Sequence, residues 1–223
     1  MQFTYHENSG DDILKVDGEL YKYLFKVRRH NKDKNIYFRN LKDDTLYSYE
    51  VLDIGKRDAS LQLTKSETKI IEAEKKLHIG WCKIDFKSIE KVIASLNEMG
   101  VDKITFIECE YSQRNEKMNF DKLQRLLINS SQQCGRSSII TIESCKSLEE
   151  FIKHNPDSYM FNFSNNNIND HTKEIDTIIL GCEGGFSKDE IVGFSNEKVV
   201  GIESNLILRS ESAALALASK LIF

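Results

Sequence analysis

A glycine-rich stretch in the last third of the chain has the residue types of a ligand-binding loop. In TIILGCEGGFSKDEI, residues 177–191, an apolar run leads into the glycine-rich loop 181–185. Three glycines let the backbone approach a ligand, and Ser187 with Glu190 predicts a capping box that starts a helix. Phosphate can bind at such a turn, but no G-K-S/T or G-x-G-x-x-G motif is present and Glu183 would repel an anion. The segment therefore favours a neutral or cationic ligand, with a purely structural turn as the alternative.

A second segment, VVGIESNLILRSESAALALASKLIF at residues 199–223, places a cation where a helix begins. A strand and a polar loop precede Leu206-Ile207-Leu208-Arg209 and an alanine-rich helix. Because the first turn of a helix favours anions, Arg209 needs an anionic partner. That partner is either Glu211 or a substrate, so Arg209 is a candidate catalytic residue.

Basic residues gather near the N-terminus although the chain has a net charge of −4. Residues 22–42 contain eight Lys or Arg and one acid, Asp33. A basic stripe on an acidic protein can bind phosphates locally, and a solvated face without a partner is the alternative. The candidate RNA contacts are Lys22, Lys26, Arg28 and Arg29.

The cysteines indicate neither a metal site nor a disulfide framework. All five (Cys82, Cys109, Cys134, Cys145 and Cys182) lack a C-x-x-C pair or a metal-ligand spacing with histidine. Hydrophobic residues make up 40% of the 223, which suits a globular protein with a real core. No apolar run approaches the ~20 residues that span a bilayer, and the N-terminus does not resemble a secretory signal. We expect a cytoplasmic protein with no membrane partner.

Two regions with different patterns of predicted strands and helices must position these residues. Residues 1–70 favour a small β-barrel, with strands at Ile13–Val16, Asn35–Arg39, Leu46–Ile54 and Ser60–Thr64 and a helix at Glu19–Val27. The charged stretch Lys65–Lys76 is predicted to be a linker.

In residues 71–223 strands alternate with helices, which predicts βαβ units and a mostly parallel sheet. Ligands of such sheets bind beyond the carboxyl ends of the strands, so we expect the site in the loops after Phe163, Leu180 and Ile202. The predicted strands are Leu77–Cys82, Lys103–Glu108, Ser138–Ile142, Tyr159–Phe163, Thr177–Leu180 and Val199–Ile202, and the predicted helices include Ser88–Met99, Phe120–Gln133 and Leu148–His154.

Two C-terminal motifs resemble a known family. LGCEGGFSKDE and LILRSESAALAL are similar to the G-P-E-G-G-F/W-S/T-x-x-E and I-L-R-x-E-T-A signatures of the RsmE-type ribosomal RNA uracil-N3 methyltransferases of the SPOUT superfamily. EMGV at residues 98–101 resembles the family's E-L-G-V, QQCGR at 132–136 its A-x-E-Q-C/S-x-R, and YLFKVR at 23–28 its H-L/I-x-x-V-L-R. The motifs occur in the family's order over nearly the whole chain, and the N-terminal one is the least specific.

The resemblance implies an α/β protein with two domains. Residues 1–70 would be a PUA-like RNA-binding β-barrel, and residues 71–223 a SPOUT methyltransferase domain with a mostly parallel sheet and a deep trefoil knot. It further implies a homodimer that uses S-adenosyl-L-methionine to methylate N3 of a uridine in the decoding region of 16S ribosomal RNA within a small-subunit particle. The residues that match the family's donor site are Phe163, Ser164, Leu180, Gly181, Glu183, Gly184, Gly185, Ile202, Leu206, Ile207 and Leu208.

The chemistry of the implied reaction selects candidate catalytic residues. Uracil N3 is a poor nucleophile until its proton leaves, so the site should stabilise the uridylate anion with a guanidinium or backbone N–H groups. The target base must also leave its stack. Arg209 is the first candidate and Arg136 the second; a structural ion pair and a phosphate contact are their respective alternatives.

Departures from the family pattern leave three other interpretations open. Cys182 replaces a proline, and Glu203-Ser204 replaces Leu-Gly before the I-L-R motif. These changes would suit a catalytically inactive RNA-binding protein. A nucleotide-dependent α/β enzyme is a second alternative, which the lack of a Walker lysine and the presence of Glu183 disfavour. A SPOUT methyltransferase that acts on a different RNA is the third.

Overall fold

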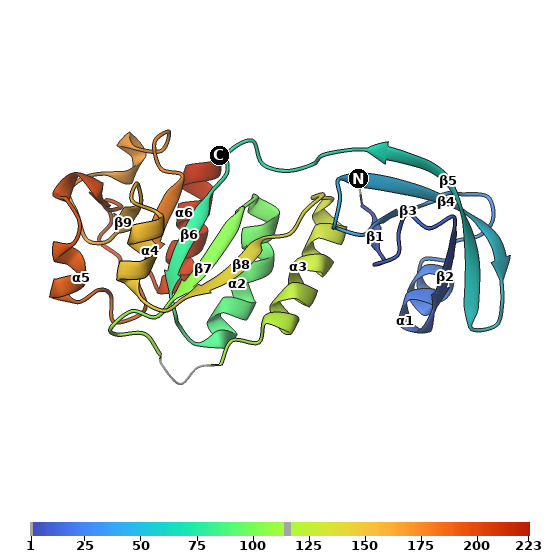
Figure 1. Cartoon of the computed structure of the whole chain (residues 1–223), viewed down its shortest axis with the longest axis horizontal. Coiled ribbons are helices and arrows are strands. Elements are labelled where there is room, and N and C mark those ends of the chain that lie inside the picture. The colour runs from blue at the N-terminus through green and yellow to red at the C-terminus, as the bar shows by residue number, and fades with distance from the viewer. Residues whose placement is uncertain (1, 114–116) are drawn as a thin grey trace. The chain divides into compact units, whose positions relative to one another are not determined.

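The computed structural model describes residues 2–113 and 117–223 (Figure 1). The chain divides into two compact units. The first comprises Met1–Glu72 with Ser131–Ser138, and the second comprises Ala73–Ser130 with Ile139–Phe223.

The first unit is built on a five-stranded mixed sheet with the order β1-β3-β4-β5-β2. Only the β1–β3 pair is parallel among the pairs described. Apolar residues alternate along β2, so Leu14 and Val16 face a core that also holds Phe38, Tyr49 and Leu61. The elements are β1 (Thr4–Tyr5), β2 (Ile13–Asp17), α1 (Gly18–Tyr21), the π-helix η1 (Lys22–Val27), β3 (Ile36–Arg39), β4 (Thr45–Ile54) and β5 (Asp58–Thr68).

The four predicted strands of this unit are present, and two expectations need correction. The predicted linker begins too early, because Lys65–Thr68 continues β5, where Thr68 pairs with Thr45 of β4. The single predicted helix is a short α-helix followed by a π-helix. β1 was missed because two residues are too few to show a periodicity.

The second unit contains a six-stranded parallel sheet with the order β11-β9-β10-β6-β7-β8. Its elements are β6 (His78–Cys82), α2 (Phe86–Met99), β7 (Lys103–Ile107), α3 (Phe120–Cys134), β8 (Thr141–Cys145), α4 (Leu148–His154), β9 (Tyr159–Phe161), η2 (Ile168–Asp170), β10 (Thr177–Leu180), α5 (Lys188–Val192), η3 (Asn196–Lys198), β11 (Val199–Val200) and α6 (Ser210–Ile222). The end of α3, from Ser131 on, is counted with the first unit. The predicted strand-helix alternation is confirmed. β8 starts three residues later than expected, where Thr141 pairs with Lys103 of β7.

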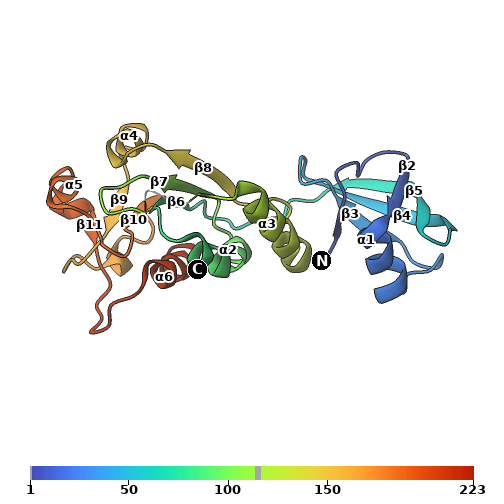
Figure 2. The same ribbon diagram turned by 90° about the horizontal axis from the view of Figure 1, so that it is seen from below.

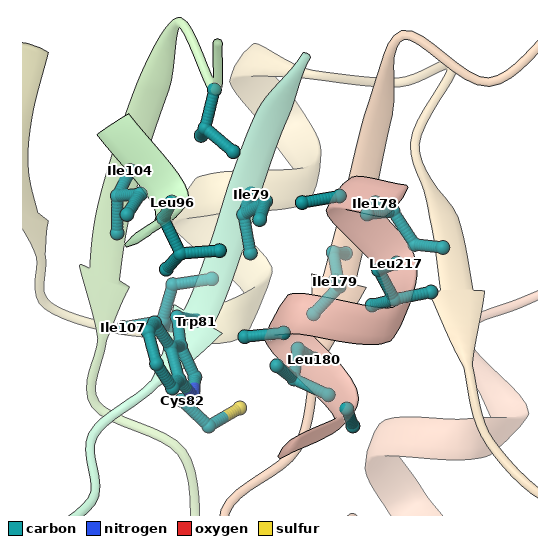
Figure 3. Packing of buried hydrophobic residues seen from close by; sticks show 14 of the residues in the cluster. Ile79, Trp81, Cys82, Leu96, Ile104, Ile107, Ile178, Ile179, Leu180 and Leu217 are labelled. Carbon is teal, nitrogen blue, oxygen red and sulfur yellow. The ribbon is translucent and has the colours of Figure 1, made fainter. Parts of the chain in front are cut away.

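Helices cover the sheet with apolar side chains. α2 and α6 lie side by side on one face, and α4 lies on the other (Figure 2). Leu96 of α2 and Leu217 of α6 lie in one buried cluster with Ile79 and Ile178 of the central strands (Figure 3). The predicted end of α2 at Met99 is confirmed, and Gly100, which follows it, has a φ of 96°.

The cysteine expectation is wrong for one pair. Cys82 and Cys109 form a disulfide, with 5.6 Å between their Cα atoms. Cys82 ends β6 and Cys109 follows β7, and these strands are neighbours. A sequence separation of 27 residues carried no signal for this pairing, because strand order brings the two thiols together.

None of the helices in the described residues has both the length and the apolar character needed to cross a membrane.

Candidate functional site

Three loops meet at the carboxyl ends of β9, β10 and β11 and enclose a cleft of about 1090 Å3. The sheet places β9 between β10 and β11, so the loops that follow these strands emerge at one edge. All eleven residues predicted to bind a donor line this cleft, together with Arg209. The tertiary structure therefore brings together every residue of the predicted donor site.

The loop after β10 turns back tightly before α5. Gly185 has a φ of 69°, which a residue with a side chain rarely adopts, and its N–H donates to the Cys182 carbonyl at 3.0 Å. The capping box is confirmed, because Ser187 Oγ accepts from the Glu190 N–H and Glu190 accepts from the Ser187 N–H. The start of α5 is thereby fixed next to the glycine-rich wall of the cleft.

The loop after β9 is locked against the chain that leaves β11. Ser164 Oγ donates to the Val199 carbonyl at 3.0 Å. A Cβ on Gly201 would lie 2.6 Å from the Ser164 carbonyl oxygen and 2.9 Å from that of Asn162. Backbone passes backbone here with no room for a side chain, so these two walls of the cleft hold each other in place.

The third wall, residues 202–209, exposes apolar side chains. Leu206 and Ile207 are 78% and 81% exposed. The Leu206 N–H donates to Ser204 Oγ at 3.0 Å, so the serine that replaces the family's glycine ties down the turn that precedes these residues. Exposed apolar residues beside a cleft offer surface that a ligand or a second chain can bury.

The carboxylates at the cleft fit the neutral or cationic ligand that the glycine-rich segment predicts. The carboxylates of Glu183 and Glu203 line it, and Arg209 is the cation at its edge. Arg209 is exposed, and in the described part of the chain its guanidinium has neither an ion pair nor a hydrogen-bond partner, so it is not bound to Glu211. Burial raises the pKa of the Cys182 thiol, which keeps it protonated and poorly nucleophilic at neutral pH.

Sequence reasoning missed several residues of the cleft. A cluster of amides follows β9, and a short run of asparagines in the sequence indicates no more than a polar loop. Ser210 occupies a variable position of the family motif and gave no signal of its own. The additional lining residues are Phe161, Asn162, Asn165, Asn167, Cys182, Phe186, Glu203, Ser204, Asn205, Ser210 and Ala213.

The second candidate catalytic residue does not line the cleft. Arg136 belongs to the first unit, whereas the cleft belongs to the second. Its side chain is buried, with 6% exposed, and its Nε donates to Ser138 Oγ at 3.0 Å. The catalytic role of Arg136 stays a prediction.

The predicted RNA contacts lie together on η1 and the residues after it. Arg28 stacks on the Tyr23 ring and donates from Nε to the Tyr23 hydroxyl at 2.9 Å. Lys26 lies over the Tyr21 ring, and Lys22 pairs with Glu19. Arg29 has a φ of 54°, a left-handed conformation that turns the chain after the helix. All four cations are exposed, and their contact with RNA phosphates stays a prediction.

Comparison with known proteins identifies relatives of the whole chain. Residues 72–222 match a family model described as an RNA methyltransferase domain. The ribosomal RNA small subunit methyltransferase E of Helicobacter pylori is 36% identical over 98% of both chains.

Two solved structures share the fold. A probable rRNA-methyltransferase from Porphyromonas gingivalis has a TM-score of 0.83 at 19% identity and covers 100% of this chain and 98% of its own. The ribosomal RNA small subunit methyltransferase E from Neisseria gonorrhoeae, bound to S-adenosyl methionine, has a TM-score of 0.79 at 16% identity, with 98% and 95% covered. The chain therefore belongs to the ribosomal RNA small subunit methyltransferase E family of RNA methyltransferases.

Proposed function

We propose that this protein uses S-adenosyl-L-methionine to methylate N3 of one uridine in the decoding region of 16S ribosomal RNA. The observation that carries the proposal is the cleft: eleven residues chosen from three separate segments line one cavity, and the arginine at its edge pairs with no carboxylate among the residues that the structure describes. The relative at 36% identity is named for the small ribosomal subunit, which supports ribosomal RNA as the substrate class.

The cleft suits a methyl donor of this kind. Its volume exceeds what a nucleoside needs, and backbone groups of the loops after β9, β10 and β11 can pair with an adenine and with the ends of an amino acid. Leu180, Leu206 and Leu208 supply apolar walls, and Glu183 favours the positive charge of a sulfonium. When bound, the donor supplies an electrophilic methyl group.

Arg209 is the residue we assign to the target base. The uridylate anion must be stabilised as the N3 proton leaves, and a guanidinium at the cleft edge that pairs with no carboxylate of the described residues can do so. Arg136 remains the second candidate, either at the base or at a phosphate of the RNA.

The rest of the assembly follows from the same family pattern. We assign the first unit as the PUA-like domain that holds RNA through Lys22, Lys26, Arg28 and Arg29, with boundaries at residues 1–70 and 71–223. The trefoil knot is assigned from the family pattern, and the backbone after β11 passes close to the loop after β9 at Gly201. The working form is a homodimer in the cytoplasm, where small-subunit particles assemble.

Methylation of isolated substrate tests the proposal. Small subunits and 16S ribosomal RNA from a strain that lacks the gene are incubated with the protein and donor, and the RNA is digested and analysed by mass spectrometry. We expect one 3-methyluridine in the decoding region, and its restoration in cells when the gene is returned. Calorimetry that shows no heat of donor binding would favour an inactive RNA-binding protein, and methylation only of transfer RNA would favour a different substrate.

A further inference from the structure

A buried serine connects the two C-terminal motifs to the single tryptophan of the chain. Ser210 Oγ donates to the Gly181 carbonyl at 2.6 Å and accepts from Trp81 Nε1 at 2.9 Å. Ser210 is 6% exposed and Trp81 is fully buried. Trp81 and Leu180 lie near the carboxyl ends of the neighbouring strands β6 and β10 (Figure 3), and Ser210 is the first residue of α6.

This arrangement fixes the first peptide of the glycine-rich loop. The peptide between Gly181 and Cys182 is planar, so holding its carbonyl also sets the direction of the Cys182 N–H. Glycine itself imposes little on the backbone, which means that the direction comes from the hydrogen bond. The indole of Trp81 in turn fixes the serine hydroxyl as the donor to Gly181, because an indole N–H can only donate.

We infer that Ser210 is a positioning residue that holds the Gly181 wall of the donor cleft against the start of α6, next to Arg209. Ser210 lines the cleft, but its hydroxyl is already satisfied by Trp81 and Gly181, so it acts through Gly181. One serine thereby sets the spacing between the loop that holds the donor and the arginine assigned to the target base. The inference rests on the proposed donor binding.

The test compares Ser210→Ala with Ser210→Thr. Alanine leaves the Trp81 N–H and the Gly181 carbonyl without their partner in a buried place, and we expect the KM and the Kd for S-adenosyl-L-methionine to rise about ten- to a hundredfold. Because the chemical step is unchanged once the donor is seated, kcat should fall much less. Threonine keeps the hydroxyl, so we expect it to restore donor affinity to within about threefold of the wild type.

Trp81 provides a spectroscopic readout, because the chain has no other tryptophan. Loss of the indole hydrogen bond should shift the Trp81 emission to the blue in Ser210→Ala, and donor binding should change the emission of the wild type. Should Ser210→Ala fail to fold, Trp81→Phe removes the indole donor together with part of a buried ring, and it keeps the Ser210–Gly181 bond. We then expect a several-fold rise in KM for the donor.

Ser130→Ala is the matched control. Ser130 is also a buried serine of the second unit, and its Oγ donates to the Ala94 carbonyl at 2.9 Å outside the cleft. We expect a similar loss of thermal stability with unchanged donor affinity. The inference is overturned if Ser210→Ala, or Trp81→Phe in its place, loses stability like the control and keeps a wild-type Kd and KM. Failure of the wild type to bind donor at all would instead overturn the proposed function.

Discussion

At the scale of single residues, Arg209 is the side chain whose surroundings most directly suggest a part in the reaction. It is exposed at the first turn of α6, and no carboxylate of the described residues neutralises it, although the helix dipole disfavours a cation there. A position that costs stability and lacks an internal partner is best explained by an anionic ligand.

Replacement of Arg209 by alanine should therefore separate catalysis from donor binding. We expect kcat to fall about a hundred- to a thousandfold, as loss of a single group that stabilises a developing anion does, while the Kd for the donor changes little. Arg209→Lys keeps the charge without the planar pair of donors, so its kcat should lie between those of the wild type and Arg209→Ala. Single-turnover methylation and calorimetry measure the two effects, and normal methylation by Arg209→Ala would contradict the assignment.

His78 makes the stability of the second unit dependent on pH. Burial beside β7 and the nearby Lys103 lower the pKa of His78 to about 4, and its Nε2 lies 2.8 Å from Thr105 Oγ1. In the unfolded chain His78 has its ordinary pKa of 6.5. Between pH 4 and 6.5 the unfolded chain therefore binds more protons than the folded protein. The stability that the neutral His78 contributes is therefore fully present above about pH 6.5, and it is lost as the pH falls towards 4.

We expect this loss to be at most about 3 kcal/mol in the free energy of unfolding. Urea denaturation at several pH values between 4 and 7 measures it, and His78→Gln should flatten the profile because glutamine does not titrate. If the free energy of unfolding of His78→Gln falls with decreasing pH as steeply as that of the wild type, other groups cause the acid sensitivity.

At the scale of elements, η1 and the two residues after it gather the predicted phosphate contacts on one short stretch. The residues that point inward, Leu24 and Phe25, anchor the helix in the core of the first unit. Lys22, Lys26, Arg28 and Arg29 remain outside. Within eight residues, the apolar side chains are buried in the core and the basic side chains are exposed to solvent.

RNA binding through this stretch should depend steeply on salt. Each lost phosphate contact lowers the slope of log K against log salt by about one. We expect Lys26→Ala to weaken binding of 16S ribosomal RNA and to reduce the slope in this way. Lys15→Ala, an exposed lysine on β2 outside the stripe, serves as the control. A flat salt dependence of the wild type would remove this stretch from the RNA-binding surface.

At the scale of the whole molecule, the second unit leaves large apolar side chains uncovered. Val192, Leu206, Ile207 and Phe223 are all exposed. Leu206 and Ile207 are neighbours in the chain, and exposed apolar residues that lie together are typical of a surface that another chain covers, which favours the proposed homodimer.

Sedimentation equilibrium tests the proposed assembly. We expect a mass of twice 25.7 kDa at micromolar concentration, because burial of apolar surface between two copies of this chain offsets the entropy lost on association. A change of Val192 to aspartate should leave the fold intact and shift the equilibrium towards monomer if that residue lies in the interface. A wild-type protein that stays monomeric at high concentration would contradict the proposal.

The sequence by itself determined the order and type of most elements and the three loops that form the cleft. Hydrophobic periodicity, the capping box at Ser187 and the stop at Gly100 are local signals, because each depends on residues a few positions apart. The end of β5 and the start of β8 were misplaced for the same reason: their limits are set by pairing with β4 and β7, which are distant partners.

Only the tertiary structure decided which distant residues touch. The Cys82–Cys109 disulfide, the bond of Ser210 to Trp81 and Gly181, and the close backbone approach of Gly201 to Ser164 all join residues more than 25 positions apart. Such contacts depend on strand order, and strand order is chosen by the packing of the whole sheet against its helices. No local pattern of residue types records that choice.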